Sequence, residues 1–312
     1  MERVLITGGA GYIGSVLTPM LLDAGYAVTV LDSFLYGQRS LDHLAGRDGL
    51  TVIAGDIRDR DPVARAVRNA DWVVHLAGIV GYPACRAKPA EATDVNIAGT
   101  ENLLAALGRS QRVLLASTLS VYGVVQGQAT EDTPLNPLSL YAEHKVSCEQ
   151  MIRQHGDDHV LLRFATVFGV SPRMRIDLLI NDFVYQAIHK RRIVLYEGGF
   201  RRAFLHVTDA AAAFLFAMGR YDPMRGGVFN VGSHEESLNC TKRQIAERIA
   251  RHVDYQLEES DCGRDLDRRN YLVDCSRIRA LGYQARVGLD DGIAGLVERL
   301  RDFVPDATCR NC

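Results

Sequence analysis

The sequence predicts an α/β protein built on a doubly wound parallel sheet. Six short apolar segments alternate with stretches whose apolar residues recur at helical spacing. Strands that are buried on both faces form continuous apolar runs, and right-handed crossovers place helices on both faces of their sheet. A glycine-rich turn after the first strand and an acidic residue at the end of the second are typical of the same architecture.

The expected elements of this sheet follow one another from the N-terminus. The first strand covers 4–6, and the helix after it covers 12–24, where Pro19 is expected to cause a kink. The other apolar strands are expected at 27–31, 51–54, 72–76, 112–116 and 159–164. The helices between them are expected at 61–69, 96–107 and 140–154.

The alternation breaks after Gly169, and the remaining chain is expected to add a smaller mixed α/β lobe. Its helices are expected at 177–189 and 289–303 and its strand at 193–196, whereas 228–231 is predicted to be another core strand. The sequence has no internal repeat, and no Pro/Ser-rich linker separates the two parts. We therefore expect the lobes to pack together, with a binding cleft between them. The expected division is a dinucleotide-binding domain over 1–168 with a return segment at about 203–233, and a substrate-binding lobe over 169–202 and 234–312.

Composition excludes several classes of partner. The 312 residues carry 36 Lys and Arg against 38 Asp and Glu, so no global field would attract nucleic acid or an anionic membrane. The longest apolar run, 210–218, has about half the length that a bilayer crossing needs. The N-terminal residues pass directly into a strand without an apolar leader. We therefore expect a cytoplasmic protein without a nucleic-acid or membrane partner.

The seven cysteines are scattered, and we expect them to be reduced thiols. Cys309 and Cys312 have the spacing of metal ligands, but no second such pair completes a zinc site. The terminal segment is therefore expected to be frayed, with no metal and no assigned function.

The turn over 7–14 has the spacing of a dinucleotide site, which indicates a Rossmann-type sheet. Its glycines allow a tight turn, a close approach of the backbone to a pyrophosphate and packing of the helix on the strand. Asp32 lies where a carboxylate accepts hydrogen bonds from ribose hydroxyls, which favours NAD over NADP, although Arg39 is a basic residue nearby. The residues expected against the pyrophosphate are Gly8, Gly11, Tyr12, Ile13 and Gly14.

Later strand ends are expected to complete the cofactor site. Asp56 and Ile57 follow the third strand and would flank the adenine, although Asp56 alone could equally cap a helix. After the fourth strand, small residues would let the cofactor lie against the backbone, namely Leu76, Ala77 and Gly78. His75 is predicted to be a buried strand residue and not a catalyst.

A catalytic set is expected at the same edge of the sheet. Tyr141 and Lys145 are four residues apart and share one helix face. A nearby ammonium lowers the pKa of a phenol, which is ordinarily about 10, so Tyr141 would be the acid/base. Lys145 would also hold the nicotinamide ribose, and Thr118 would offer a hydroxyl to the same substrate oxygen. The carboxyl ends of parallel strands converge, so these residues should meet the glycine turn.

With the glycine turn, Asp32 and the catalytic set, the sequence resembles the extended short-chain dehydrogenase/reductase family, in particular its nucleotide-sugar epimerases, dehydratases and reductases. The resemblance covers nearly the whole chain. The matching pieces are TGGAGYIG (7–14), Asp32, DI (56–57), HLAG (75–78), Asn96, STLSVYG (117–123), YAEHK (141–145), RFATVFG (163–169), RRAFLHVTD (201–209) and DRRNYLVD (267–274).

The resemblance implies roles for individual residues. Thr118, Tyr141 and Lys145 would be the catalytic triad, and Asn96 would belong to the neighbourhood of the active site and its cofactor. It also implies a homodimer in which helices 96–107 and 140–154 form a four-helix bundle. Arginines from different segments can clamp a diphosphate bidentately. The residues implied to hold the diphosphate of a nucleotide sugar are Asn181, Arg202, and Arg268 or Arg269.

The residues after Thr118 guide the choice of reaction. The family's 4,6-dehydratases carry Asp-Glu there, and its glucuronate decarboxylases also carry a Glu, whereas this chain has Leu119 and Ser120. Without acidic residues at these positions, dehydration or decarboxylation is less expected. An NAD-dependent epimerase, acting at C4, is favoured over a ketosugar reductase using NAD(P)H. The non-enzymatic alternative is an NAD-binding sensor or assembly protein, which would not need an activated phenol. Candidates for sugar recognition are Tyr82, Arg86 and Tyr196.

Overall fold

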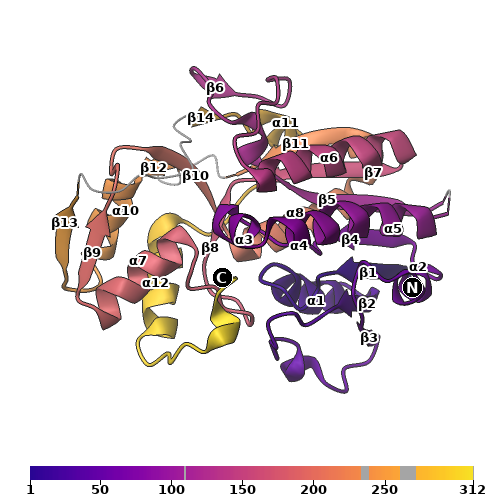
Figure 1. Cartoon of the computed structure of the whole chain (residues 1–312), viewed down its shortest axis with the longest axis horizontal. Coiled ribbons are helices and arrows are strands. Elements are labelled where there is room, and N and C mark those ends of the chain that lie inside the picture. The colour runs from indigo at the N-terminus through magenta and orange to yellow at the C-terminus, as the bar shows by residue number, and fades with distance from the viewer. Residues whose placement is uncertain (109, 233–238, 261–271, 312) are drawn as a thin grey trace.

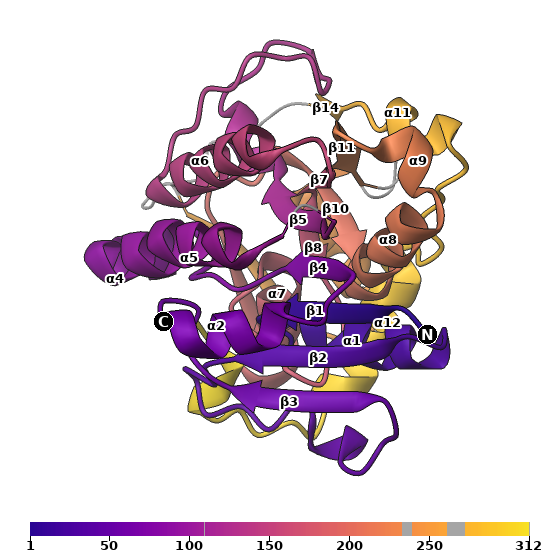
Figure 2. The same ribbon diagram turned by 90° about the vertical axis from the view of Figure 1, so that its right-hand side faces the viewer.

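The computed structural model describes residues 1–108, 110–232, 239–260 and 272–311 (Figure 1). Within these residues the main sheet has seven parallel strands in the order β11-β7-β5-β4-β1-β2-β3, which Figure 2 shows stacked in this sequence. The strands are β1 (Arg3–Thr7), β2 (Ala27–Asp32), β3 (Leu50–Ala54), β4 (Trp72–His75), β5 (Arg112–Thr118), β7 (His159–Phe164) and β11 (Gly227–Val231). The predicted doubly wound parallel sheet is confirmed, and the predicted strand 228–231 forms its edge beside β7.

Helices cover both faces of this sheet (Figure 2). The helices on one face are α1 (Gly14–Asp23), α8 (Val207–Gly219), α9 (Tyr221–Met224) and α11 (Ser276–Ala280). Those on the other face are α2 (Arg60–Val67), α5 (Gly99–Ala106) and α6 (Leu140–His155). The apolar run considered above for its length is part of α8, and none of the described helices is long and apolar enough to cross a membrane.

Two predicted helices have different beginnings in the structure. α1 begins at Gly14 and not at residue 12, because the glycine turn continues to Ile13, and Gly25 follows its end at a φ of 86°. The segment predicted as a helix over 96–107 is preceded by two short helices, α3 (Tyr82–Ala87) and α4 (Pro89–Thr93). A π-helical turn over Asp94–Ala98 then leads into α5. Prolines in the first turns of α3 and α4 explain this division, because proline suits a helix start.

The second part of the chain forms a smaller lobe with its own core (Figure 1). Strands β8 (Thr166–Phe168), β10 (Arg201–His206) and β12 (Asn239–Thr241) pair in one small sheet, and β9 (Arg192–Leu195) pairs with β13 (Gln256–Glu259). The helices that pack on them are α7 (Leu179–His189), α10 (Lys242–Ile249) and α12 (Leu289–Leu300). A further pair of short strands joins β6 (Gln128–Ala129) to β14 (Leu272–Val273), and short 3-10 turns lie at Asp42–Leu44, Leu119–Tyr122 and Ala307–Cys309.

The prediction of a frayed terminal segment is wrong for the residues that the structure describes. The Asp306 side chain accepts a hydrogen bond from Thr308 N and caps the turn Ala307–Cys309. Cys309 is buried in the core of the second lobe, and its carbonyl accepts a hydrogen bond from Ile176 N at 3.0 Å. Sequence spacing did not indicate this packing, because the partners of the segment lie more than a hundred residues away.

A buried ion pair joins α6 to the main sheet. Arg163 on β7 donates from Nε and Nη2 to the two carboxylate oxygens of Glu149 on α6, at 2.9 and 2.6 Å. Ser117 on β5 donates to the same carboxylate, and Arg163 Nη1 donates to the Tyr122 hydroxyl at 2.9 Å. Burial by itself lowers the pKa of Arg163, but Glu149 reverses this and the pKa is raised. The pair therefore fixes α6 against the strand that ends at Thr118.

Candidate active site

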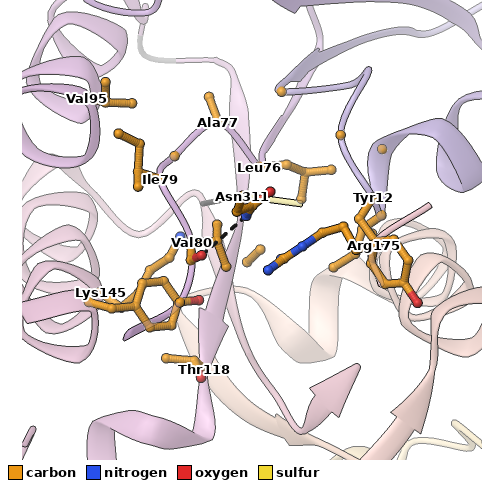
Figure 3. Close-up of a pocket in the computed structure, with 18 of the residues that line it drawn as sticks. Tyr12, Leu76, Ala77, Ile79, Val80, Val95, Thr118, Lys145, Arg175 and Asn311 are labelled. Carbon is orange, nitrogen blue, oxygen red and sulfur yellow. Dashed lines mark hydrogen bonds between the residues drawn. The ribbon is translucent and has the colours of Figure 1, made fainter. Parts of the chain in front are cut away.

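A long pocket runs along the carboxyl ends of the central strands and continues onto the second lobe. It is lined by the glycine turn, by the loops after β2, β4 and β5, by the start of α6 and by the loop after β8. Asn311 also lines it (Figure 3). The predicted cofactor and catalytic positions that line it are Gly8, Gly11, Tyr12, Ile13, Gly14, Asp32, Asp56, Ile57, Leu76, Ala77, Gly78, Thr118, Tyr141 and Lys145.

The glycine turn forms a cradle in which side chains would not fit. Gly8 has a φ of 73°, and a Cβ there would lie 2.6 Å from Ala77 N. A Cβ on Gly14 would lie 2.6 Å from Gly9 Cα, so this glycine lets α1 start against the turn. Backbone at the beginning of a helix, with no side chains in front of it, suits a pyrophosphate. The residues present therefore fit a bound dinucleotide.

Asp32 is held in place by the backbone around it. Its carboxylate accepts hydrogen bonds from Ala10 N at 2.9 Å and from Phe34 N at 2.8 Å. Burial raises the pKa of Asp32, and these hydrogen bonds oppose that rise. Arg39, the basic residue nearby in sequence, forms an exposed ion pair with Asp42 and does not line the pocket. The negative charge at the end of β2 is thus not neutralised by Arg39.

Replacing Asp32 with Ala is expected to weaken NAD binding by at least about tenfold and to reduce the preference for NAD over NADP. The physical reason is that the carboxylate would accept hydrogen bonds from the ribose hydroxyls and would repel a 2′-phosphate. Affinities for both cofactors, measured by calorimetry, provide the test. Asp71→Ala removes a surface carboxylate that pairs with Arg3, and it should change neither affinity. An unaltered preference in Asp32→Ala would refute the role.

The ends of β3 and β4 supply a further wall. Asp56 forms a bidentate ion pair with Arg58, whose guanidinium lowers the pKa of Asp56. Ile57 is buried, and both residues line the pocket. His75 is a buried strand residue, as predicted, with Thr7 Oγ1 and Thr100 Oγ1 near its two ring nitrogens at 2.7 and 3.0 Å. Burial lowers the pKa of His75 to about 3, which keeps this ring neutral.

Asn96 supports the loop after β4 without lining the pocket. Its Oδ1 accepts a hydrogen bond from Ile79 N at 2.8 Å, and its Nδ2 donates to Ile79 O at 3.0 Å. Gly78 lies against the same side chain, because a Cβ there would be 2.9 Å from Asn96 Oδ1. The π-helical turn places Asn96 under the loop. Its contacts are those of a residue that positions the wall of the pocket.

Thr118, Tyr141 and Lys145 line one part of the pocket, where the end of β5 meets the start of α6. α6 begins directly after Ser139, whose side chain accepts a hydrogen bond from Ala142 N and so caps the helix. Thr118 Oγ1 donates to Ser120 Oγ at 3.0 Å and accepts from Ser120 N at 3.2 Å. Lys145 is buried, which lowers its pKa.

Arginines that the sequence analysis did not single out also line the pocket. Arg173 and Arg175 follow β8, and both are buried. Arg175 forms a bidentate ion pair with Asp177, whereas Arg173 Nε has no hydrogen-bond partner among the described residues. The guanidinium of Arg173 stacks on Tyr36 at 4.6 Å. The signal that could have identified both arginines is their position in the short segment 172–175, soon after the end of a strand.

Two of the predicted diphosphate ligands, Asn181 and Arg202, do not line this pocket. Asn181 is fully buried, where its amide donates to Arg175 O at 2.8 Å and its Oδ1 accepts from Gly169 N at 3.0 Å. These contacts bind the loop after β8 and leave Asn181 outside the pocket lining. Arg202 lies on β10 and does not line the pocket either. Arg268 and Arg269 lie outside the described residues.

The three candidates for sugar recognition are placed differently. Tyr82 lines the pocket, and its hydroxyl accepts a hydrogen bond from Arg86 at 3.2 Å. Arg86 stacks on the same ring, with its guanidinium carbon 5.9 Å from the ring centroid, but does not line the pocket. Tyr196 is 40% exposed and also lies outside the pocket lining. Tyr82 alone of these three therefore reaches the pocket directly.

Comparison with known proteins identifies the family. Residues 4–232 match the model of the NAD dependent epimerase/dehydratase family. The chain is 34% identical over 310 residues to the low-salt glycan biosynthesis protein Agl12 of Haloferax volcanii, covering 95% of this chain and 97% of that one. It is 31% identical to the dTDP-glucose 4,6-dehydratase of Streptomyces niveus, covering 96% and 93% of the two chains.

A solved structure supports the same assignment. The UDP-glucose 4-epimerase of Thermus thermophilus in complex with NAD superposes with a TM-score of 0.83, at 28% identity, covering 97% of this chain and 100% of that one. The dehydratase and the epimerase among these proteins thus carry out different reactions on nucleotide sugars. The glycine cradle, the family match and the NAD-bound neighbour agree on the cofactor. The chain belongs to the NAD dependent epimerase/dehydratase family and is an NAD-dependent enzyme that modifies nucleotide sugars.

Proposed function

We propose that this enzyme is an epimerase that inverts C4 of a nucleotide sugar, with Tyr141 as acid/base. The observation that separates this reaction from a dehydration is the chemistry next to Thr118. Leu119 is buried in the main core, and the Ser120 hydroxyl accepts a hydrogen bond from Thr118. Neither is a base of useful strength, so neither can remove a proton beside a ketone to start an elimination. Epimerisation and simple reduction need no such base.

The proposed reaction uses three side chains of the pocket. Tyr141 would remove the proton of the C4 hydroxyl as C4 gives up its hydride, and would return the proton when the hydride comes back to the opposite face of the ketosugar. Thr118 holds the same oxygen, and Ser120 orients the Thr118 hydroxyl through hydrogen bonds of 3.0 and 3.2 Å. Lys145 places a cation near the phenolate and favours its charged form. NAD supplies the acceptor and later the donor of the hydride.

The cofactor would be held from both parts of the chain. The glycine cradle receives the pyrophosphate, and Asp32 receives the ribose of the adenosine. Arg173 N donates to Ser15 Oγ at the start of α1, and the Arg173 guanidinium stacks on Tyr36, which lines the same pocket as the cradle. We assign Arg173 to the pyrophosphate, because a buried guanidinium pairs well with a phosphate. A cofactor enclosed in this way suits an epimerase, which reuses it in place.

The same proposal includes a homodimer and a cytoplasmic location. α5 and α6 carry half-buried apolar residues at the margin of a buried cluster, among them Leu104 on α5 and Met151 on α6. Pairing of these helices with those of a second copy would form a four-helix bundle and cover these residues. Sedimentation of the purified protein tests the assembly, and a monomer at micromolar concentration would contradict it.

The function is tested with a panel of UDP- and dTDP-sugars incubated with the purified enzyme and followed by NMR. Mass spectrometry of the purified protein should detect NAD that has remained bound. An epimerase is expected to convert one C4 epimer into the other without added NADH. A strict need for stoichiometric NADH would identify a ketosugar reductase and refute the proposal. Formation of a 4-keto-6-deoxy sugar would identify a dehydratase and refute it equally.

A further inference from the structure

Residues 306–311 cross the second lobe and end inside the pocket. Arg310 O accepts a hydrogen bond from Arg173 Nη2 at 3.3 Å, and Asn311 N donates to Asp177 Oδ2 at 3.4 Å. With the contact between Cys309 and Ile176, these bonds attach the segment to the loop after β8. The segment is therefore an ordered part of the wall that also carries Arg173 and Arg175.

Asn311 connects this wall to the opposite one. Its Nδ2 donates to Val80 O at 3.3 Å, and Val80 belongs to the loop after β4 on the dinucleotide-binding side. In Figure 3 the Asn311 side chain lies toward the middle of the pocket, between Arg175 on one side and Lys145 on the other. Thr118 and Lys145 line this pocket too, so Asn311 lies in the same pocket as the proposed catalytic residues.

The remaining polar atom of this side chain lacks a partner. Asn311 Oδ1 is buried and has no hydrogen bond within the described part of the chain. A buried acceptor without a donor is costly, so such an atom in a pocket is suited to a donor from a ligand. The terminal torsion of an asparagine is broad, and the bond to Val80 is long, so the amide can turn toward a bound hydroxyl.

We propose that Asn311 is a sugar-binding residue that helps determine which nucleotide sugar the enzyme accepts. This inference rests on the proposed function, because it takes the sugar to lie beside Thr118, Tyr141 and Lys145. The Asn311 side-chain oxygen accepts a hydrogen bond from a sugar hydroxyl, and the amide closes the pocket against Val80. A bulky substituent on that side of the sugar would meet the 306–311 segment.

The test replaces Asn311 with Leu, which keeps a similar volume and removes the amide. Binding is measured by calorimetry for UDP-glucose and dTDP-glucose and for the matching nucleotides UDP and dTDP. We expect Asn311→Leu to bind the nucleotide sugar about five- to tenfold more weakly, as the loss of one hydrogen bond predicts. Affinity for the nucleotide without a sugar should stay the same. In turnover, KM for the nucleotide sugar should rise more than kcat falls.

Controls separate this role from stability and from the proposed function. Arg310→Ala changes an exposed side chain one residue earlier and should leave all these affinities unchanged. Asn311→Ala, with the same thermal midpoint as the wild type, should repeat the sugar-specific loss. Equal affinity for the nucleotide sugar in both Asn311 variants and the wild type would overturn the inference, as would tighter binding, which would mark Asn311 as an obstruction. Absence of epimerisation by the wild type would instead refute the proposed function alone.

Discussion

Replacing Tyr141 with Phe is expected to reduce kcat by a factor of at least about 100, because general acid/base groups contribute roughly 10²- to 10⁴-fold. The variant loses only the phenolic oxygen, while the ring remains in the pocket that Thr118 and Lys145 also line. NAD should remain bound, because the glycine cradle and Asp32 are unchanged. The measurement is turnover of the substrate identified in the panel, together with the amount of NAD that copurifies.

Tyr185→Phe is the matched control for this variant. Tyr185 lies on α7, where its ring packs on His189 with the centroids 4.5 Å apart, and it does not line the pocket. Its hydroxyl has no part in the proposed reaction, so kcat should be unchanged. Normal turnover by Tyr141→Phe would exclude Tyr141 as the acid/base. Loss of bound NAD in Tyr141→Phe would show instead that the phenol is needed to hold the cofactor.

Replacing Glu149 with Gln is expected to lower the free energy of unfolding by about 3–5 kcal/mol, because it leaves the buried charge of Arg163 uncompensated. Both side chains of this pair are only 2–3% exposed. The same change also weakens the hydrogen bond that the Ser117 hydroxyl donates to the side chain at position 149. Urea unfolding, followed by circular dichroism with and without NAD, provides the measurement. Fluorescence should follow the same transition if unfolding is two-state.

A second Glu→Gln substitution provides the control. Glu259 on β13 pairs with Arg243, and both side chains are about half exposed, at 50% and 49%. Exposed pairs contribute about 1 kcal/mol or less, so Glu259→Gln should hardly shift the transition. If the two variants lose equal stability, burial is not the reason that the Glu149–Arg163 pair contributes to the free energy of unfolding. Restoring stability in Glu149→Gln with Arg163→Met would support the uncompensated charge as the cause.

Local patterns in the sequence were sufficient to predict the main sheet and its cofactor turn. The predicted strands 27–31, 112–116 and 159–164 are mostly apolar, and the structure places them in β2, β5 and β7. At Gly8 and at Gly14 a Cβ would lie only 2.6 Å from a neighbouring backbone atom, so only glycine fits at these two positions. Such features depend on a few neighbouring residues, so a pattern in the sequence reveals them.

Short-range spacing also indicated the pair Tyr141 and Lys145, because four residues make about one helical turn. The convergence of these residues with Thr118 followed from the rule that parallel strands end at one edge of a sheet. The individual roles of these residues remain predictions. The two short helices before α5 were missed, because the apolar period in that region is interrupted by Pro83 and Pro89.

Only the tertiary structure decided which charged and polar side chains reach the pocket. Asn181 matched an expected ligand position, yet its amide is used within the protein by Gly169 and Arg175. Asn311 carried no signal in the sequence, because its partners Val80 and Asp177 are 231 and 134 residues away. A pattern of neighbouring residues encodes strands, helices and turns, whereas contacts between distant segments arise when the lobes pack. The glycine turn after β1 is of the first kind, and the wall formed by Asn311 and the loop after β8 is of the second.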